Sequence, residues 1–204
     1  MAGPPAEALS TAANEAELLV IGSRGLSGVA GFFVGSVAQA AVAHVGRPVV
    51  LVRAGESTED EHLPDAAGMA LTRPCHELLE FAFSAAAQRG ARLRVINGWH
   101  LPTAYSYSPG VLDPGLDVEL ADNEKGALSE ALRPWRDKFP GVEVIEQSVI
   151  GRPAQHLMEA ASDCSLVVIG RRTRHAAAGT HIGPVAHAVI HHCDAPIAVI
   201  PHEA

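Results

Sequence analysis

The sequence has few cysteines, few aromatic residues and no surplus of basic residues, and these shortages exclude several classes of protein. Three cysteines in 204 residues, widely spaced and without a CxxC pair, do not form a disulfide framework or a zinc knuckle. A formal net charge of −8 argues against a nucleic acid or an anionic membrane as partner, because affinity for either depends on clustered lysine and arginine.

Long apolar runs are also missing. No run approaches the roughly 18 to 20 residues that a membrane helix needs. The first ten residues, MAGPPAEALS, lack the basic start and the apolar centre of a signal peptide. We therefore expect a cytoplasmic chain without a membrane partner, and its 48% apolar content suffices for one or two buried cores.

An aliphatic run followed by spaced glycines is the most informative feature that is present. Leu18 to Ile21 is short and bounded by glycine, as a buried parallel strand is, and residues 34–45 are rich in Ala and Val and of helical length. Gly22 and Gly25 would allow positive φ and bring backbone N–H groups close to an anion. The segment from Ser36 to Gln39 has the spacing of a capping box. The pattern predicts a phosphate-binding loop between a strand and a helix.

This segment occurs twice in the chain. A shift of 148 positions aligns residues 3–53, the first copy, with residues 151–201, the second copy, without a gap and with more than a third of the pairs identical. Such self-similarity indicates one substructure used twice. Each copy is predicted to be a helix, a strand, a glycine loop, a helix and a strand.

Further elements precede the second copy. Two helices are predicted there, at residues 74–88 and 116–139. Three strands are predicted as well, at residues 66–71, 92–96 and 142–149. The alternation predicts an α/β fold of Rossmann-like type, a five-stranded parallel sheet with helices on both faces, together with a partial second copy. We assign residues 64–204 to a complete domain, residues 1–53 to the C-terminal half of another, and the charged residues 54–63 to a linker.

The spacing Gly22-x2-Gly25-x9-Gly35-Ser36, with the flanking runs LLVIGSRG and PVVLVR, resembles the nucleotide-binding signature of the universal stress protein family in its tandem-repeat form. The resemblance implies an adenine-nucleotide-binding fold with ATP as the ligand. In that family the glycine loop and an aspartate after the first strand hold the phosphates and the ribose. The nucleotide-binding positions that it implies in this chain are Gly22, Ser23, Arg24, Gly25, Gly35, Ser36, Val37, Gly170 and Gly183.

The second copy departs from the family pattern. Ala70 stands where the aspartate is expected, Thr173 replaces a glycine, and Pro184 replaces the serine and removes one N–H group. The first copy keeps its glycines, but its own first strand would lie upstream of Met1. We therefore expect impaired nucleotide binding by the second domain. Three arginine side chains could bind phosphate in place of the lost groups: Arg171, Arg172 and Arg174.

The favoured function is a non-enzymatic stress-response or regulatory module that binds adenine nucleotide. The alternatives are an ATP hydrolase or phosphoryl-transfer protein that uses the loop from Gly22 to Ser36, and a ligand-free dimerisation module. No catalytic residue is assigned, because the sequence has no G-x-S-x-G elbow and no base paired to its loop serines. Members of the family that this chain resembles commonly pair through their last strands, and the resemblance implies that residues 48–53 and 196–201 pair in the same way and extend the sheet across the two copies. The open edge at Leu18 to Ile21 predicts a homodimer or larger homo-oligomer.

Two other side-chain groups were weighed for chemistry. His187 and His191 stand four residues apart, so one helical face would carry two imidazoles, but no third ligand is apparent and no metal site is assigned. Cys75 lies beside His76 at an expected helix start, a position that lowers a thiol pKa, and a redox role is the alternative to a structural one.

Overall fold

The structure is a computed structural model of the whole chain. The residues that it describes are 5–23, 35–53, 66–71, 75–100, 116–151, 153–173 and 182–203.

Helices and strands alternate along these residues. They are α1 (Pro5–Asn14), β1 (Leu19–Ser23), α2 (Ser36–His44), β2 (Val49–Arg53), β3 (Ala66–Leu71), α3 (His76–Arg89), β4 (Arg92–Trp99), α5 (Leu116–Lys138), β5 (Val144–Ile150), α6 (Pro153–Ala161), β6 (Cys164–Arg172), α7 (Pro184–His192) and β7 (Ile197–His202). The predicted positions of these elements are confirmed to within a few residues.

All the described strands join one sheet in the order β1-β2-β7-β6-β3-β4-β5. Neighbouring strands run parallel except for β2 and β7, which are antiparallel. The predicted pairing of the last strands of the two copies is therefore confirmed. It extends the sheet across the two copies, as expected.

The β2–β7 pairing relates the two copies by a local two-fold axis. Val50 lies opposite Ala198, which is its own counterpart at the repeat offset of 148, and Val49 and Leu51 lie opposite Val199 and Ile197. Because equivalent residues are paired across β2 and β7, equivalent side chains of the two copies point to the same face of the sheet.

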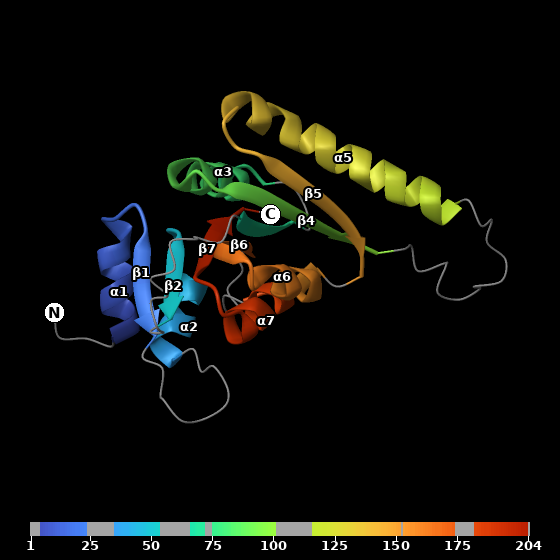
Figure 1. Cartoon of the computed structure of the whole chain (residues 1–204). Coiled ribbons are helices and arrows are strands. Elements are labelled where there is room, and N and C mark those ends of the chain that lie inside the picture. Colours follow the sequence, from blue (N-terminus) through green and yellow to red (C-terminus); the bar gives the residue numbers. More distant parts are fainter. Residues whose placement is uncertain are drawn as a thin grey trace, which may run out of the picture.

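The sheet is covered differently on its two faces. Helices α3 and α5 lie on one face, and α6 and α7 lie on the other (Figure 1). The core under α3 and α5 includes Phe83 and Leu132. All of its buried residues lie between positions 78 and 200, outside the first copy. The core on the opposite face joins Val42 and Leu51 of the first copy to Leu157 of the second. Apolar burial on that face therefore holds the two copies together.

Within the described part of the chain, no helix has both the length and the apolar character that a membrane crossing requires.

Candidate functional site

The first glycine loop connects the end of β1 to the start of α2. Gly22 and Ser23 end β1, and Gly35 lies directly before α2. Ser36 and Val37 open that helix and are exposed. The loop between, with Arg24 and Gly25, lies outside the described residues. The structure thus brings the two described ends of the predicted nucleotide loop to the strand–helix junction that the sequence indicated.

The predicted capping box is wrong. The N-cap of α2 is Gly35, whose carbonyl accepts the N–H of Gln39 at 3.0 Å, and no side chain caps the helix. The Gln39 side chain instead lies 3.2 Å from Nε2 of His191 on α7. Gly35 has φ −58°, and Gly22 is not among the described glycines with positive φ, so neither needs glycine for its backbone conformation.

The second copy repeats this geometry. Gly170 lies in β6, and Gly183 is the N-cap of α7 with φ −61° and ψ 159°, against −58° and 154° at Gly35. The first residue of α2 has an N–H group to offer an anion, whereas α7 begins with Pro184, which has none. The two helix starts are therefore alike in shape and different in hydrogen-bonding capacity.

His202, at the end of β7, contacts the two residues Gly170 and Thr173 at the end of β6. The backbone N–H and the hydroxyl of Thr173 both donate to the His202 carbonyl, at 2.8 and 3.0 Å. The imidazole of His202 packs on Gly170 so closely that a Cβ there would lie 2.8 Å from Nε2. The Thr173 amide is thus already bonded, and one donor that a phosphate would need is used within the protein.

This packing gives a matched test at the two counterpart glycines. Gly170→Ala should lower the free energy of unfolding by about 1 kcal/mol or less, because the His202 ring must move and its side chain can do so. Gly22→Ala should have a smaller effect, since nothing lies within 4 Å of a Cβ at Gly22. Urea unfolding measures both. Combining Gly170→Ala with His202→Ala should remove the difference, and a persisting difference would show that the ring is not its cause.

The end of β3 lies next to the second glycine loop. Ala70 is paired with Ile169, the residue directly before Gly170. The structure therefore brings together the strand end that should carry the family's aspartate and the glycine that should face the phosphates. At this junction the chain has a methyl group in place of a carboxylate. In the first copy, β1 is the counterpart of β6, and among the described strands it pairs with β2 alone, so no strand takes the place that β3 has beside β6.

Arg171 is not an available phosphate ligand. Its side chain is only 3% exposed and donates to the carbonyls of Ala43 and Val45, at 3.0 and 2.6 Å. These carbonyls end helix α2, where a cation is favoured. Burial lowers the pKa of the Arg171 guanidinium from its ordinary value. The arginine therefore ties β6 of the second copy to α2 of the first. Arg172 is exposed, and Arg174 lies outside the described residues.

The paired histidines do lie side by side. The rings of His187 and His191 have centroids 4.4 Å apart, and His191 also contacts Gln39. No group of three or more His, Cys, Asp or Glu side chains suited to a metal ion occurs in the described ranges. The structure thus shows a tilted histidine pair on α7, of which His191 contacts α2 through Gln39.

The expected lowering of the Cys75 pKa is wrong. Cys75 is the N-cap residue of α3, but burial of the thiol raises its pKa above the ordinary 9.0, aided by the charge of Glu77 and opposed by a hydrogen bond to the backbone of Leu78. Burial of the thiolate raises the pKa by more than the position at the helix N-terminus lowers it. This environment does not favour a redox-active thiol.

Alkylation kinetics test this assignment. At pH 8, Cys75 should react with iodoacetamide more slowly than free cysteine, and its rate should still be rising above pH 9, because only the thiolate reacts. Cys75→Ser should remove the most accessible of the three labelling sites, since Cys164 and Cys193 are buried. A rate that levels off below pH 8 would contradict the raised pKa.

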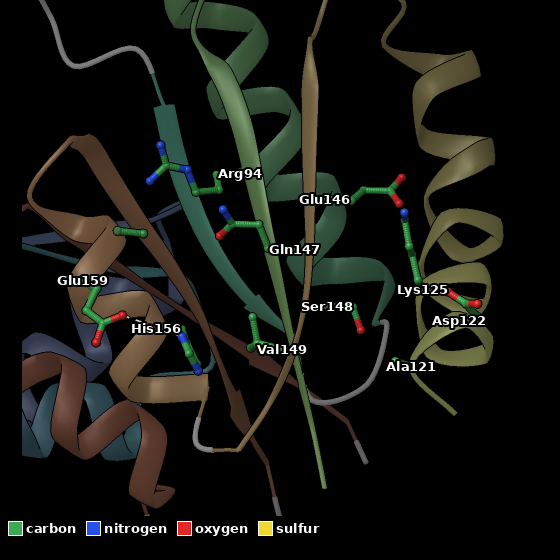
Figure 2. A pocket seen from close by; sticks show the side chains of 11 residues that line it. Arg94, Ala121, Asp122, Lys125, Glu146, Gln147, Ser148, Val149, His156 and Glu159 are labelled. Carbon is green, nitrogen blue, oxygen red and sulfur yellow. Dashed lines mark ion pairs between the residues drawn. The ribbon is translucent and has the colours of Figure 1, made fainter. Parts of the chain in front are cut away.

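A cavity of about 640 Å³ lies around strand β5, and none of the predicted nucleotide-binding residues lines it. Figure 2 shows Arg94, Gln147 and His156 on one side of β5 and Glu146, Ser148 and Lys125 on the other. Glu146 is paired with Arg136, and the Ser148 hydroxyl is buried without a hydrogen-bond partner in the described part of the chain. No sequence motif had pointed to this group. The available signal was Arg94, which interrupts the apolar residues of β4.

The parallel-dominated sheet, the helices on both faces and the two strand–glycine–helix junctions define a doubly wound α/β protein. The sequence profile described as "Universal stress protein family" matches residues 2–53 and 67–201. The chain belongs to the universal stress protein family.

Relatives and solved structures agree with this. The chain is 30% identical over 198 residues to universal stress protein Rv2005c of Mycobacterium tuberculosis, covering 96% of this chain and 65% of the relative. It is 31% identical over 199 residues to Rv1996 of the same organism, covering 94% and 61%. A universal stress protein structure from Archaeoglobus fulgidus matches with a TM-score of 0.64 at 18% identity, over 98% of this chain and 67% of that chain, and supports the fold. The chain thus spans about two thirds or less of the length of these curated relatives.

Proposed function

We propose that the chain is a non-enzymatic, cytoplasmic stress-response module that binds adenine nucleotide at the first glycine loop, from Gly22 to Val37, and has lost this capacity at the second. The proposal divides the chain into a half-domain at residues 1–53, a linker at residues 54–63 and a complete domain at residues 64–204. The contacts of His202 carry it, because they occupy the Thr173 amide and cover Gly170 in the complete domain.

The size of the loss can be estimated from its parts. A hydrogen bond to a charged group contributes about 1.5 to 3 kcal/mol. Ala70 removes the carboxylate contact and Pro184 removes a phosphate donor. Losing two such bonds weakens binding by about two to four decades, so a micromolar site becomes negligible. The first copy keeps Ser36 at the corresponding helix start.

Calorimetric titration of the full chain with ATP tests which loop binds. Gly35→Val and Gly183→Val are matched variants, because both glycines are N-caps with negative φ and nothing lies within 4 Å of a Cβ at either. Saturable binding should persist in Gly183→Val and disappear in Gly35→Val, where the branched side chain blocks the approach of phosphate. Equal losses in both variants, or no saturation of the unaltered chain at millimolar ATP, would contradict the proposal.

The same variants separate the alternatives. A phosphoryl-transfer enzyme would release phosphate from ATP, and Gly35→Val would abolish that turnover. A sensor binds ATP without turnover, which is the result expected here. A ligand-free dimerisation module would show neither ATP binding nor turnover. Ala70, Thr173 and Pro184 support this alternative only if the first loop also fails to bind ATP.

A further inference from the structure

Three polar side chains meet where α7 of the second copy contacts α2 of the first: His187, His191 and Gln39. The Gln39 amide nitrogen lies 3.2 Å from Nε2 of His191. Because an amide nitrogen only donates hydrogen bonds, His191 Nε2 is the acceptor and carries no proton. An unprotonated imidazole nitrogen is the form that binds a metal ion. The sequence showed two imidazoles four residues apart, and the fold adds a third polar group from 152 residues away.

The spacing of these groups is that of ligands on one metal ion. Zn²⁺ lies about 2.1 Å from an imidazole nitrogen or a ligand oxygen, with about 90° to 110° between its ligands. At these values, two ligand atoms on one ion are about 3.0 to 3.4 Å apart, and the centroids of two bound imidazoles are about 4.5 to 5 Å apart. The observed 3.2 Å lies within the first range, and the 4.4 Å between the histidine centroids lies just below the second.

Small side-chain rotations suffice to bring the three groups to one ion. His187 is exposed and His191 is only partly buried, so both rings have room to turn. A half-turn of the Gln39 amide places its oxygen where its nitrogen lies, and the two ends of an amide have nearly the same size. The result is a ligand set of two imidazole nitrogens and one amide oxygen, with water in the remaining positions.

This ligand set selects one class of cation. Imidazole suits Zn²⁺, Ni²⁺ and Cu²⁺, whereas Mg²⁺ takes oxygen ligands. His191 also lies in the last turn of α7, where the helix dipole favours a positive charge. The chemistry therefore favours a divalent late transition-metal ion over a hard cation.

The duplication does not repeat this ligand set. At the offset of 148, the counterpart of His187 is Gln39 itself, and the counterpart of His191 is Ala43. The set related by the local two-fold axis is therefore Gln39, Ala43 and His187, which contains a single imidazole. The pair of imidazoles comes from the second copy, and the amide comes from the first.

We propose that His187, His191 and Gln39 bind one divalent late transition-metal ion and that this ion links the two copies. The link arises because two ligands belong to α7 and one to α2. Since α2 begins directly after Gly35, the ion restrains the helix that follows the first glycine loop. None of the three ligands belongs to the proposed nucleotide-binding loop, so the metal site and the ATP site stand or fall independently.

Calorimetric titration of the full chain with zinc chloride at pH 7.5, without ATP, tests the site. One Zn²⁺ per chain is expected to bind saturably. His187→Ala and His191→Ala should each raise the Kd by about thirtyfold or more, because each removes one of the two imidazoles. Gln39→Leu is similar in size but has no oxygen, and it should raise the Kd by about three- to tenfold, since a neutral amide is a weaker ligand than imidazole.

Two controls accompany this titration. His192→Ala is the matched variant, because His192 follows His191 directly, has the same side chain and is exposed. It should leave the Kd for Zn²⁺ unchanged. Magnesium chloride in about tenfold excess should not compete with Zn²⁺, because Mg²⁺ does not favour imidazole ligands.

Hydrogen exchange tests whether the ion links the copies. Zn²⁺ should slow amide exchange in both α2 and α7 of the unaltered chain. In Gln39→Leu at saturating Zn²⁺, the protection of α7 should remain and that of α2 should be lost.

Any of three results would overturn the proposal. The first is an absence of saturable binding at submillimolar Zn²⁺. The second is an equal change of Kd in His191→Ala and His192→Ala, which would show scattered binding to surface histidines. The third is an unchanged Kd and unchanged exchange in Gln39→Leu, which would confine the ion to α7 and remove the link between the copies.

Discussion

Replacing Arg171 with methionine is expected to lower the free energy of unfolding by about 2 to 4 kcal/mol. The guanidinium donates to the carbonyls of Ala43 and Val45, and each hydrogen bond to a charged group contributes about 1.5 to 3 kcal/mol. Methionine has a similar length but no donor, so both carbonyls at the end of α2 lose their side-chain partner. Relief of the burial of a charge offsets part of this loss.

Urea unfolding followed by circular dichroism measures the change. Arg172→Met is the matched control, because Arg172 is the next residue, carries the same charge and is exposed. The control should shift the free energy by less than about 0.5 kcal/mol. Hydrogen exchange in α2 and β2 should accelerate in Arg171→Met more than exchange in α3. If the two variants lose equal stability, the cross-copy hydrogen bonds contribute nothing measurable.

Replacing Phe83 with alanine is expected to cost about 3 to 5 kcal/mol, the largest effect of any substitution considered. Phe83 is fully buried in α3 and stacks against both Trp135 and Phe139, with ring centroids at 5.9 and 5.7 Å, while Trp135 and Phe139 also stack on each other. Alanine keeps the helix propensity of the position, so the loss comes from the removed ring and the cavity that it leaves.

Phe81→Ala is the control for this second substitution. Phe81 lies on the same helix but is only partly buried against the core, so its loss should be clearly smaller. The fluorescence of Trp135 should change in Phe83→Ala, because that indole loses one of its two stacked phenylalanine rings, and should change little in the control. Equal destabilisation by the two substitutions would mean that the stacked cluster adds nothing beyond ordinary apolar burial.

The sequence by itself determined the local elements and the duplication. Strands such as Leu19–Ser23 and Ala66–Leu71 follow from short apolar runs bounded by glycine or polar residues, and the offset of 148 related the two copies before any contact was known. Local signals suffice for these features because periodicity and turn residues act over a few positions. The cap of α2 was misassigned by one residue, since Gly35 accepts the first helical bond that Ser36 was expected to accept.

Only the tertiary structure decided what the loop residues do. Arg171 follows Gly170 in a glycine loop, which suggests a phosphate ligand, but the fold places its guanidinium at the end of a helix 126 to 128 residues away. His202 has no sequence signal that links it to Thr173, and their contact exists because β6 and β7 are neighbours. Leu18 and Leu166 have the same side chain and opposite exposure. A residue type records what a position can bury or bind, whereas the partner that it meets depends on which distant elements the fold brings to it.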